Sequence, residues 1–72
     1  MDYQVLNSQA TRHLAFSERY DVNADGENVG YFPRKREAIR AAEAYSDLHH
    51  VSVTVLDRML RGGEVVARVK AQ

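Results

Sequence analysis

A tight turn at Asp25-Gly26 constrains the fold of this chain more than any other short segment. Both residues can adopt the positive φ angles that a type I′ hairpin turn requires, and apolar residues recur on either side. A two-residue turn here sets three cross-strand pairs: Ala24 with Glu27, Val22 with Val29, and Tyr20 with Tyr31. The last two pairs place apolar side chains on one face, so the sequence predicts a β-hairpin with that face buried.

The first strand of this hairpin is expected to begin well before the turn. Apolar and polar residues alternate over residues 14–22, which is the period of a half-buried strand. Glu18 interrupts the apolar face, which is compatible with a bend or bulge. Residues 1–11 carry little pattern, and Tyr3, Val5 and Leu6 fit either a short strand or a loosely ordered tail.

A helix is predicted over residues 34–48. Pro33 suits the first helical position, because its missing N–H costs nothing there. Apolar side chains then recur every three or four residues, as on the buried face of a helix. They are Ala38, Ile39, Ala42 and Tyr45, with Ala41 and Leu48 on the flank. Because this stripe is mostly alanine, the helix can lie close to a sheet.

A second hairpin is predicted after the helix. Residues 51–56 are typical of a strand, Gly62-Gly63 of a two-residue turn, and residues 64–70 of a returning strand. This turn pairs Leu60 with Val65, Leu56 with Val69, and Asp57 with Arg68. The apolar residues then divide between the two faces: Val51, Val53 and Val55 on one, and Leu56, Leu60, Val65 and Val69 on the other. Either a bulge near Asp57 reverses the alternation, or both faces are covered.

The order of these elements predicts a single α+β domain over residues 1–72, arranged β-β-α-β-β, with one helix packed on one face of an antiparallel sheet. Its core is marginal at 72 residues, and the absence of cysteine excludes disulfides, thiolate zinc sites and cysteine nucleophiles. The sequence has no apolar run of about 18 residues and no basic N-terminus leading into an apolar stretch. We therefore expect a cytoplasmic protein with no membrane partner.

Ten cations and ten anions cancel in this chain, but they are segregated along it. Residues 34–40 carry a net charge of +3, against −3 over residues 1–33 and zero over residues 41–72. The cations of this segment form a candidate site for an anion, a nucleic acid or an acidic partner: Arg34, Lys35, Arg36 and Arg40. They lie at the predicted helix start, where the macrodipole disfavours cations but free N–H groups favour phosphate or carboxylate. The alternative interpretation is a solvated helix face.

Three other patterns have simpler structural explanations. The spacing of Asp21, Asn23 and Asp25 matches the first half of a calcium loop, but Phe32 stands where that loop needs a glutamate. His49 and His50 are adjacent, which suits contact with a helix C-terminus better than chelation of one ion. The serines have no nucleophile-elbow context, and no glycine-rich phosphate loop is present. We therefore expect no enzyme activity, no metal site and no cofactor.

Residues 29–38 read VGYFPRKREA and precede an alanine-rich helix. This stretch resembles the strand–helix junction of AP2-like and integrase arm-type DNA-binding modules, and the resemblance covers residues 19–46. Those modules contact DNA through a three-stranded sheet, so the resemblance implies a nucleic-acid partner; this chain departs from them in its second hairpin and in its few strand cations. The strand order also resembles short phage and mobile-element proteins, including anti-CRISPR inhibitors, which implies surface binding to a protein.

The sequence thus favours a small non-enzymatic binding or accessory protein, with another protein or a second copy of itself as the partner and no small-molecule substrate. The apolar residues left over on the second hairpin form a candidate dimer surface: Leu56, Leu60, Val65 and Val69. The alternative hypothesis is a nucleic-acid-binding module that uses the basic helix start.

Overall fold

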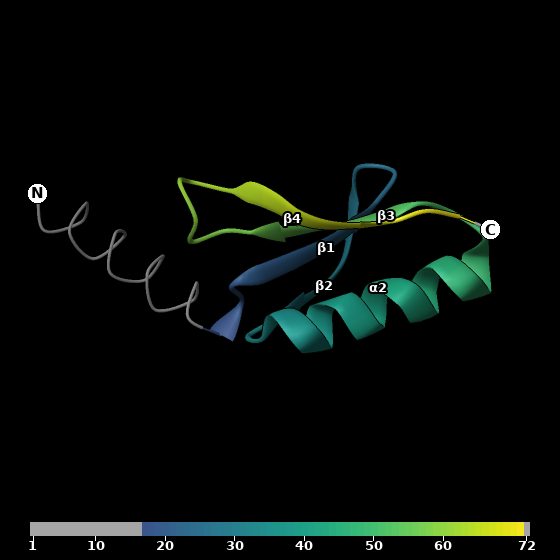
Figure 1. The fold of residues 1–72 in the computed structure, drawn as a ribbon, viewed down its shortest axis with the longest axis horizontal. Helices are drawn as coiled ribbons and strands as arrows, with labels where there is room; N and C mark the ends of the chain where they lie inside the picture. The colour runs from purple at the N-terminus through teal and green to yellow at the C-terminus, as the bar shows by residue number, and fades with distance from the viewer. Residues whose placement is uncertain (1–16, 72) are drawn as a thin grey trace, which may run out of the picture.

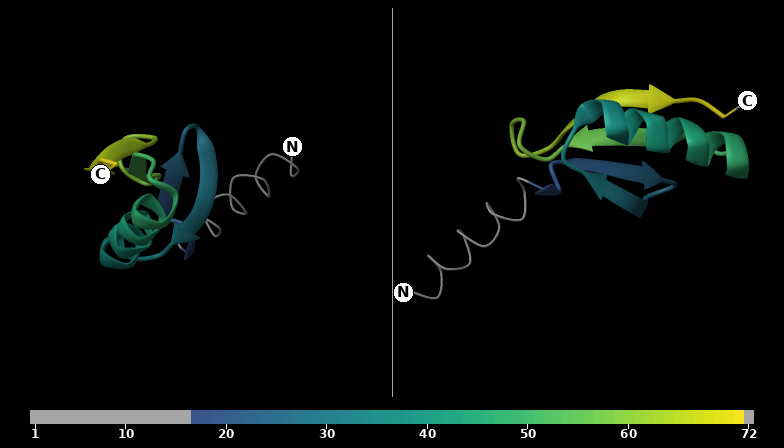
Figure 2. Two further views of the ribbon diagram at one scale, coloured as in Figure 1. Left: turned by 90° about the vertical axis from the view of Figure 1, so that its right-hand side faces the viewer. Right: turned by 90° about the horizontal axis from the view of Figure 1, so that it is seen from below.

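A computed structural model describes residues 17–71 of the chain. Its elements are β1 (Tyr20–Ala24), β2 (Glu27–Phe32), α2 (Lys35–His49), β3 (Val53–Asp57) and β4 (Glu64–Val69). The strands form one antiparallel sheet in the order β2-β1-β3-β4, and α2 runs along one face of it (Figures 1 and 2). The predicted α+β class and element order are confirmed. The interpretation of residues 1–11 and the predicted strand start at Leu14 lie outside the described residues. Within them, β1 begins at Tyr20, so the prediction that the strand includes residues 17–19 is wrong.

The core lies between α2 and the two central strands of the sheet. Alternate residues of β1 and β3 face the helix and are buried: Tyr20, Val22, Ala24, Val53 and Val55. The helix buries Ala38, Ala42 and Ser46, which recur every four residues. Because these three side chains are small, the helix can approach the sheet closely, while Ile39 and Tyr45 pack around the edge of the core.

The first hairpin has the predicted turn but a different register beyond it. Asp25 and Gly26 adopt φ angles of 53° and 82°, and Ala24 pairs with Glu27 as predicted. A bulge between Val22 and Asn23 then shifts the ladder, so the predicted pairs of Val22 with Val29 and of Tyr20 with Tyr31 are wrong. The observed pairs are Val22 with Gly30, Asp21 with Tyr31, and Tyr20 with Phe32.

This bulge decides which aromatic side chain reaches the core. Phe32 packs against the core, whereas Tyr31, predicted to be buried, is 42% exposed. A Cβ atom on Gly30 would lie 3.1 Å from Cε1 of Phe32. The phenyl ring therefore occupies space that a side chain at position 30 would need. The shifted register packs the wholly apolar ring against the core and leaves the phenol, which has a hydroxyl group to hydrate, at the surface.

The second hairpin is closed by a six-residue loop, residues 58–63, and not by Gly62-Gly63 alone. Arg61, Gly62 and Gly63 have consecutive positive φ angles of 50°, 77° and 124°, and the Gly63 N–H donates to the Leu60 carbonyl at 2.8 Å. All three predicted pairs of this hairpin are therefore wrong. The observed ones include Leu56 with Val65, Thr54 with Arg68, and Val53 with Val69.

A bulge also reverses the alternation in this hairpin, but it lies in β4. Val55 pairs with Ala67 and Leu56 with Val65, which leaves Val66 as the extra residue. Val69 and Ala67 consequently pack against the core, while Val65 faces away from α2. Since β2 carries the other bulge, both edge strands of the sheet are interrupted, which discourages edge-to-edge pairing with another chain.

The helix begins at Lys35, one residue after the predicted range of 34–48 and two residues after Pro33, which was predicted to be the first helical residue. Arg34 is the N-cap, so Pro33 lies outside the helix and helps to set the extended approach to it. At the other end, the His49 ring lies 4.2 Å from the Tyr45 ring, and His50 adopts the left-handed conformation with its N–H donating to the Ser46 carbonyl. Over residues 17–71, no helix is long and apolar enough to cross a membrane.

Candidate binding surfaces

The basic helix start is exposed and uncapped. Arg34 makes no side-chain capping hydrogen bond. The first helical backbone bond runs from the Ala38 N–H to the Arg34 carbonyl at 3.1 Å, so the N–H groups of residues 35–37 have no acceptor within the helix. All four predicted cations are at the surface. The physical requirements for binding an anion are therefore met locally, with donors and positive charge on one turn.

Tertiary structure divides these cations between two hollows. Arg34 and Glu37 line both of them. Arg36 and Arg40 complete the first hollow, on the outer side of the helix. The second lies between the helix start and segments outside the strands, where Arg19 before β1, Pro33 after β2 and Met59 after β3 close it. Lys35 lines neither, and its charge instead acts on the carboxylate of Asp57. The structure thus brings together three of the four predicted residues.

Asp57 is a buried carboxylate next to this site, and sequence patterns did not single it out. Only 3% of the residue is exposed. Its Oδ1 accepts from Arg19 Nε and from the Met59 N–H, both at 3.0 Å, and Oδ2 accepts from Arg19 Nη2 at 2.9 Å. The bidentate Arg19 bond, then the Met59 N–H and the charges of Arg19 and Lys35, hold the pKa of Asp57 below its ordinary value against the opposing effect of burial. The same bond raises the pKa of Arg19.

A second ion pair lies beside the first, with the acid and the base exchanged between the two segments. Arg58 Nη1 lies 3.6 Å from Glu18 Oε1 and donates to the Glu18 carbonyl at 3.0 Å, while the Arg58 N–H donates to the Arg19 carbonyl at 2.8 Å. We call Glu18, Arg19, Asp57 and Arg58 the double ion pair. It joins the segment before β1 to the end of β3. In the sequence, this group corresponds only to two acid–base dipeptides, residues 18–19 and 57–58, which are 39 positions apart. No local pattern could therefore have identified it.

The uncovered face is the side of the sheet that no element of residues 17–71 covers. It presents two rows of side chains across all four strands: Tyr31, Asp21, Leu56 and Val65 in the first row, and Asn28, Asn23, Thr54 and Arg68 in the second. Arg58 lies over the Tyr31 ring, 5.0 Å from its centroid. Tyr31 and Val65 are 42% and 38% exposed. This face therefore combines apolar and aromatic groups with a cation.

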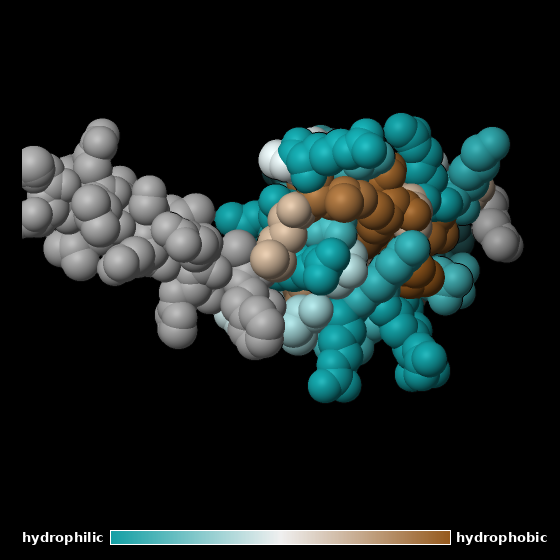
Figure 3. Space-filling model, turned by 60° about the vertical axis from the view of Figure 1, so that its left-hand side comes forward, coloured by the Kyte–Doolittle hydropathy of each residue, from teal (hydrophilic) through white to brown (hydrophobic). Residues whose placement is uncertain are grey.

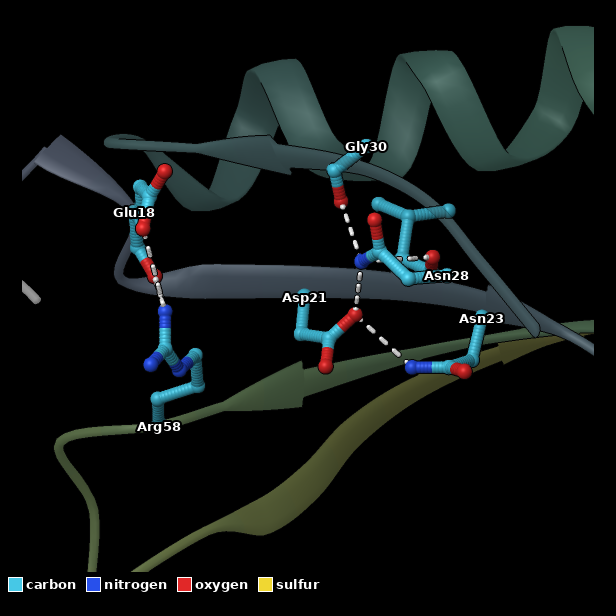
Figure 4. Close-up of polar contacts among 7 residues, drawn as sticks. Glu18, Asp21, Asn23, Asn28, Gly30 and Arg58 are labelled. Carbon is cyan, nitrogen blue, oxygen red and sulfur yellow. Dashed lines mark hydrogen bonds and ion pairs between the residues drawn. The ribbon is translucent and has the colours of Figure 1, made fainter. Parts of the chain in front are cut away.

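A polar group of three side chains lies on β1 and β2 within this face (Figure 4). Asn23 Nδ2 donates to Asp21 Oδ1 at 2.7 Å, and Asn28 Nδ2 donates to the same oxygen. Asn28 Nδ2 also donates to the Gly30 carbonyl at 3.1 Å. Since Asp21 is held by two amides and sits in a regular strand, the sequence match to a calcium loop has a purely structural explanation. Within residues 17–71, no group of three histidine or acidic side chains could hold a metal ion.

The predicted dimer surface is split by the observed register. Leu56 and Val65 are cross-strand neighbours on the uncovered face. Leu60, in the loop that closes β3 and β4, is 39% exposed. Val69 packs against the core on the helix side, so it does not belong to the same face. Figure 3 shows apolar surface gathered in one area of the molecule, bordered by long polar side chains.

Comparisons with protein-family models, with curated proteins and with solved structures gave no match.

Proposed function

We propose that this protein is a non-enzymatic binding protein that recognises a protein partner, either another protein or a second copy of itself, through the uncovered face. The observation that carries the proposal is the row of Tyr31, Leu56 and Val65 on a sheet face that no described element covers. Tyrosine and arginine are enriched among the residues that dominate the affinity of protein interfaces, and Arg58 is stacked on Tyr31 at this site. The bulged edge strands favour contact through the face over strand addition at an edge.

This proposal is tested by affinity purification from the native host. We expect a protein partner to be recovered with the tagged wild-type chain and to be lost with the double variant Tyr31→Ala/Val65→Ser. Leu48→Ser is the matched control, because Leu48 is a more exposed apolar residue, at 74%, on the helix. Circular dichroism would verify that all variants fold. Equal recovery with the double variant, or no recovery with the wild-type chain, would reject the proposal.

A second candidate function is nucleic-acid binding at the helix start. The observation in its favour is the uncapped first turn with Arg34, Arg36 and Arg40 around one hollow. Affinity should fall with salt by about one unit of log–log slope for each phosphate contacted. The triple variant Arg34→Ala/Lys35→Ala/Arg36→Ala should abolish binding, whereas Arg61→Ala/Lys70→Ala, which removes exposed cations elsewhere, should retain it. Absence of binding at low salt would eliminate this candidate.

A further inference from the structure

The charges of the uncovered face are arranged as a diagonal. Asp21 lies on β1 in the first row, and Arg68 lies on the edge strand β4 in the second row. With strands about 4.8 Å apart and residues about 3.3 Å apart along a strand, the two positions are separated by about 12 Å. Leu56 and Thr54, on the strand between them, lie equally near the midpoint, and Val65 is the cross-strand neighbour of Leu56. An anion and a cation therefore flank a centre that is apolar on the Leu56 and Val65 side.

Neither charge is neutralised within residues 17–71. Both amide donors to Asp21 use Oδ1, so Oδ2 remains available. The exposed guanidinium of Arg68 has no hydrogen bond or ion pair to another described residue. By contrast, the remaining cation at this face, Arg58, is already paired with Glu18 and stacked on Tyr31. Asp21 and Arg68 are thus the two charges of this face with capacity to bind a partner.

This pattern is complementary to itself. Consider a two-fold axis that lies in the plane of contact, passes midway between Asp21 and Arg68, and is perpendicular to the line that joins them. This axis places each Asp21 opposite Arg68 of the other copy. The same axis brings Leu56 and Val65 of one copy against the same pair of the other. Like charges stay about 12 Å apart. An axis parallel to the strands through the middle of the sheet would instead place Asp21 against a leucine and leave its charge unpaired.

We propose that the partner of the uncovered face is a second copy of this chain, packed face to face about this two-fold axis with reciprocal Asp21–Arg68 pairs around Leu56 and Val65. The inference rests on the proposed function, because it names the occupant of the same surface. The sheet face measures only about 19 by 17 Å, which is small for a stable interface. The dimer is therefore weak and should form in the micromolar range.

Sedimentation equilibrium of the full-length chain, from about 5 µM to about 1 mM, tests this dimer. We expect wild-type protein to dimerise, and Asp21→Arg and Arg68→Asp each to weaken dimerisation at least about tenfold. The double variant Asp21→Arg/Arg68→Asp should recover the wild-type constant, because the reversed charges again face each other. Asp47→Arg/Lys70→Asp, which reverses two exposed charges on the helix side of the molecule, is the matched control and should leave the constant unchanged. If Asp21→Arg fails to fold, Arg68→Asp and Arg68→Ala still test the contact.

Three results would overturn the inference: a wild-type monomer throughout this range, a dimer insensitive to Arg68→Asp, or a folded double variant that does not recover. These results are separable from failure of the proposed function. A different protein recovered by the wild-type chain and lost with Tyr31→Ala/Val65→Ser would retain the binding function while removing the second copy as the occupant.

Discussion

At the scale of single residues, Asp57 is the most constrained polar group among residues 17–71. It is nearly inaccessible, carries a charge, and is satisfied by three donors from two segments. Such a carboxylate stabilises the fold only while it is ionised, because its protonated form loses the bidentate bond with Arg19.

The pH dependence of stability follows from the lowered pKa of Asp57. A carboxyl with a lower pKa in the folded state contributes stability that is complete above its unfolded pKa of about 4 and is lost as pH falls through the folded value. Urea unfolding between about pH 6 and about pH 2 should therefore show a loss of wild-type stability below about pH 4. The variant Asp57→Asn should be less stable near neutral pH and should show a smaller acid loss. An equal acid loss in both proteins would contradict the assignment.

At the scale of elements, α2 has an unfavourable charge distribution. Arg34 occupies the N-cap without capping it, and anions lie toward the C-terminal end. Serine would cap the first turn and would remove a cation from the positive end of the dipole. The start of α2 is therefore not optimised for stability, although Glu37 in the first turn and His49 in the last turn are favourably placed.

We expect Arg34→Ser to raise the free energy of unfolding by about 1 kcal/mol. The cause is the new capping bond together with the removal of the cation. Urea denaturation measures this gain, with Lys70→Ser as a control that removes an exposed cation far from any helix end and should change stability by less than about 0.5 kcal/mol. If Arg34→Ser were destabilising, the Arg34 side chain would be making a stabilising contact that outweighs the cap.

The elements also show how far the sequence predicts this fold. The Asp25-Gly26 turn, the helical stripe and the β-branched strand each depend on near neighbours, and all three are present as predicted. The pair registers failed because each of the two edge strands contains a bulge. A bulge depends on which side chains pack against the distant helix, and the bulge in β2 places Phe32 on the core side of the sheet. Of the candidate dimer residues, Val69 lies on the core side of the sheet and not on the predicted face, because of the bulge in β4.

At the scale of the whole molecule, the part described by residues 17–71 has one helix on one face of a four-stranded sheet, and the core between them is thin. Its largest fully buried side chains are three valines, Val22, Val53 and Val55. A domain with so little buried apolar volume has a small stability margin. Even a small loss of buried apolar volume in the core should therefore lower the free energy of unfolding of the whole domain.

The same substitution on the two sides of the sheet measures this asymmetry. Val55→Ala, at a fully buried site, should lower the free energy of unfolding by about 2 kcal/mol. Val65→Ala, on the uncovered face, should lower it by less than about 1 kcal/mol when measured on dilute protein. Thermal unfolding followed by circular dichroism compares the two directly. Equal losses would mean that the uncovered face is packed as tightly as the core.

The sequence by itself determined the element order, the hairpin turn, the helix stripe and the cluster of cations at the helix start, because each depends on residues within a few positions of one another. Only the tertiary structure decided the strand registers and the double ion pair between residues 18–19 and 57–58. It also decided the diagonal placement of the Asp21 and Arg68 charges on either side of Leu56. Those features need segments about 40 residues apart to meet, and which side chains meet is set by packing against α2 and by the bulges that packing selects.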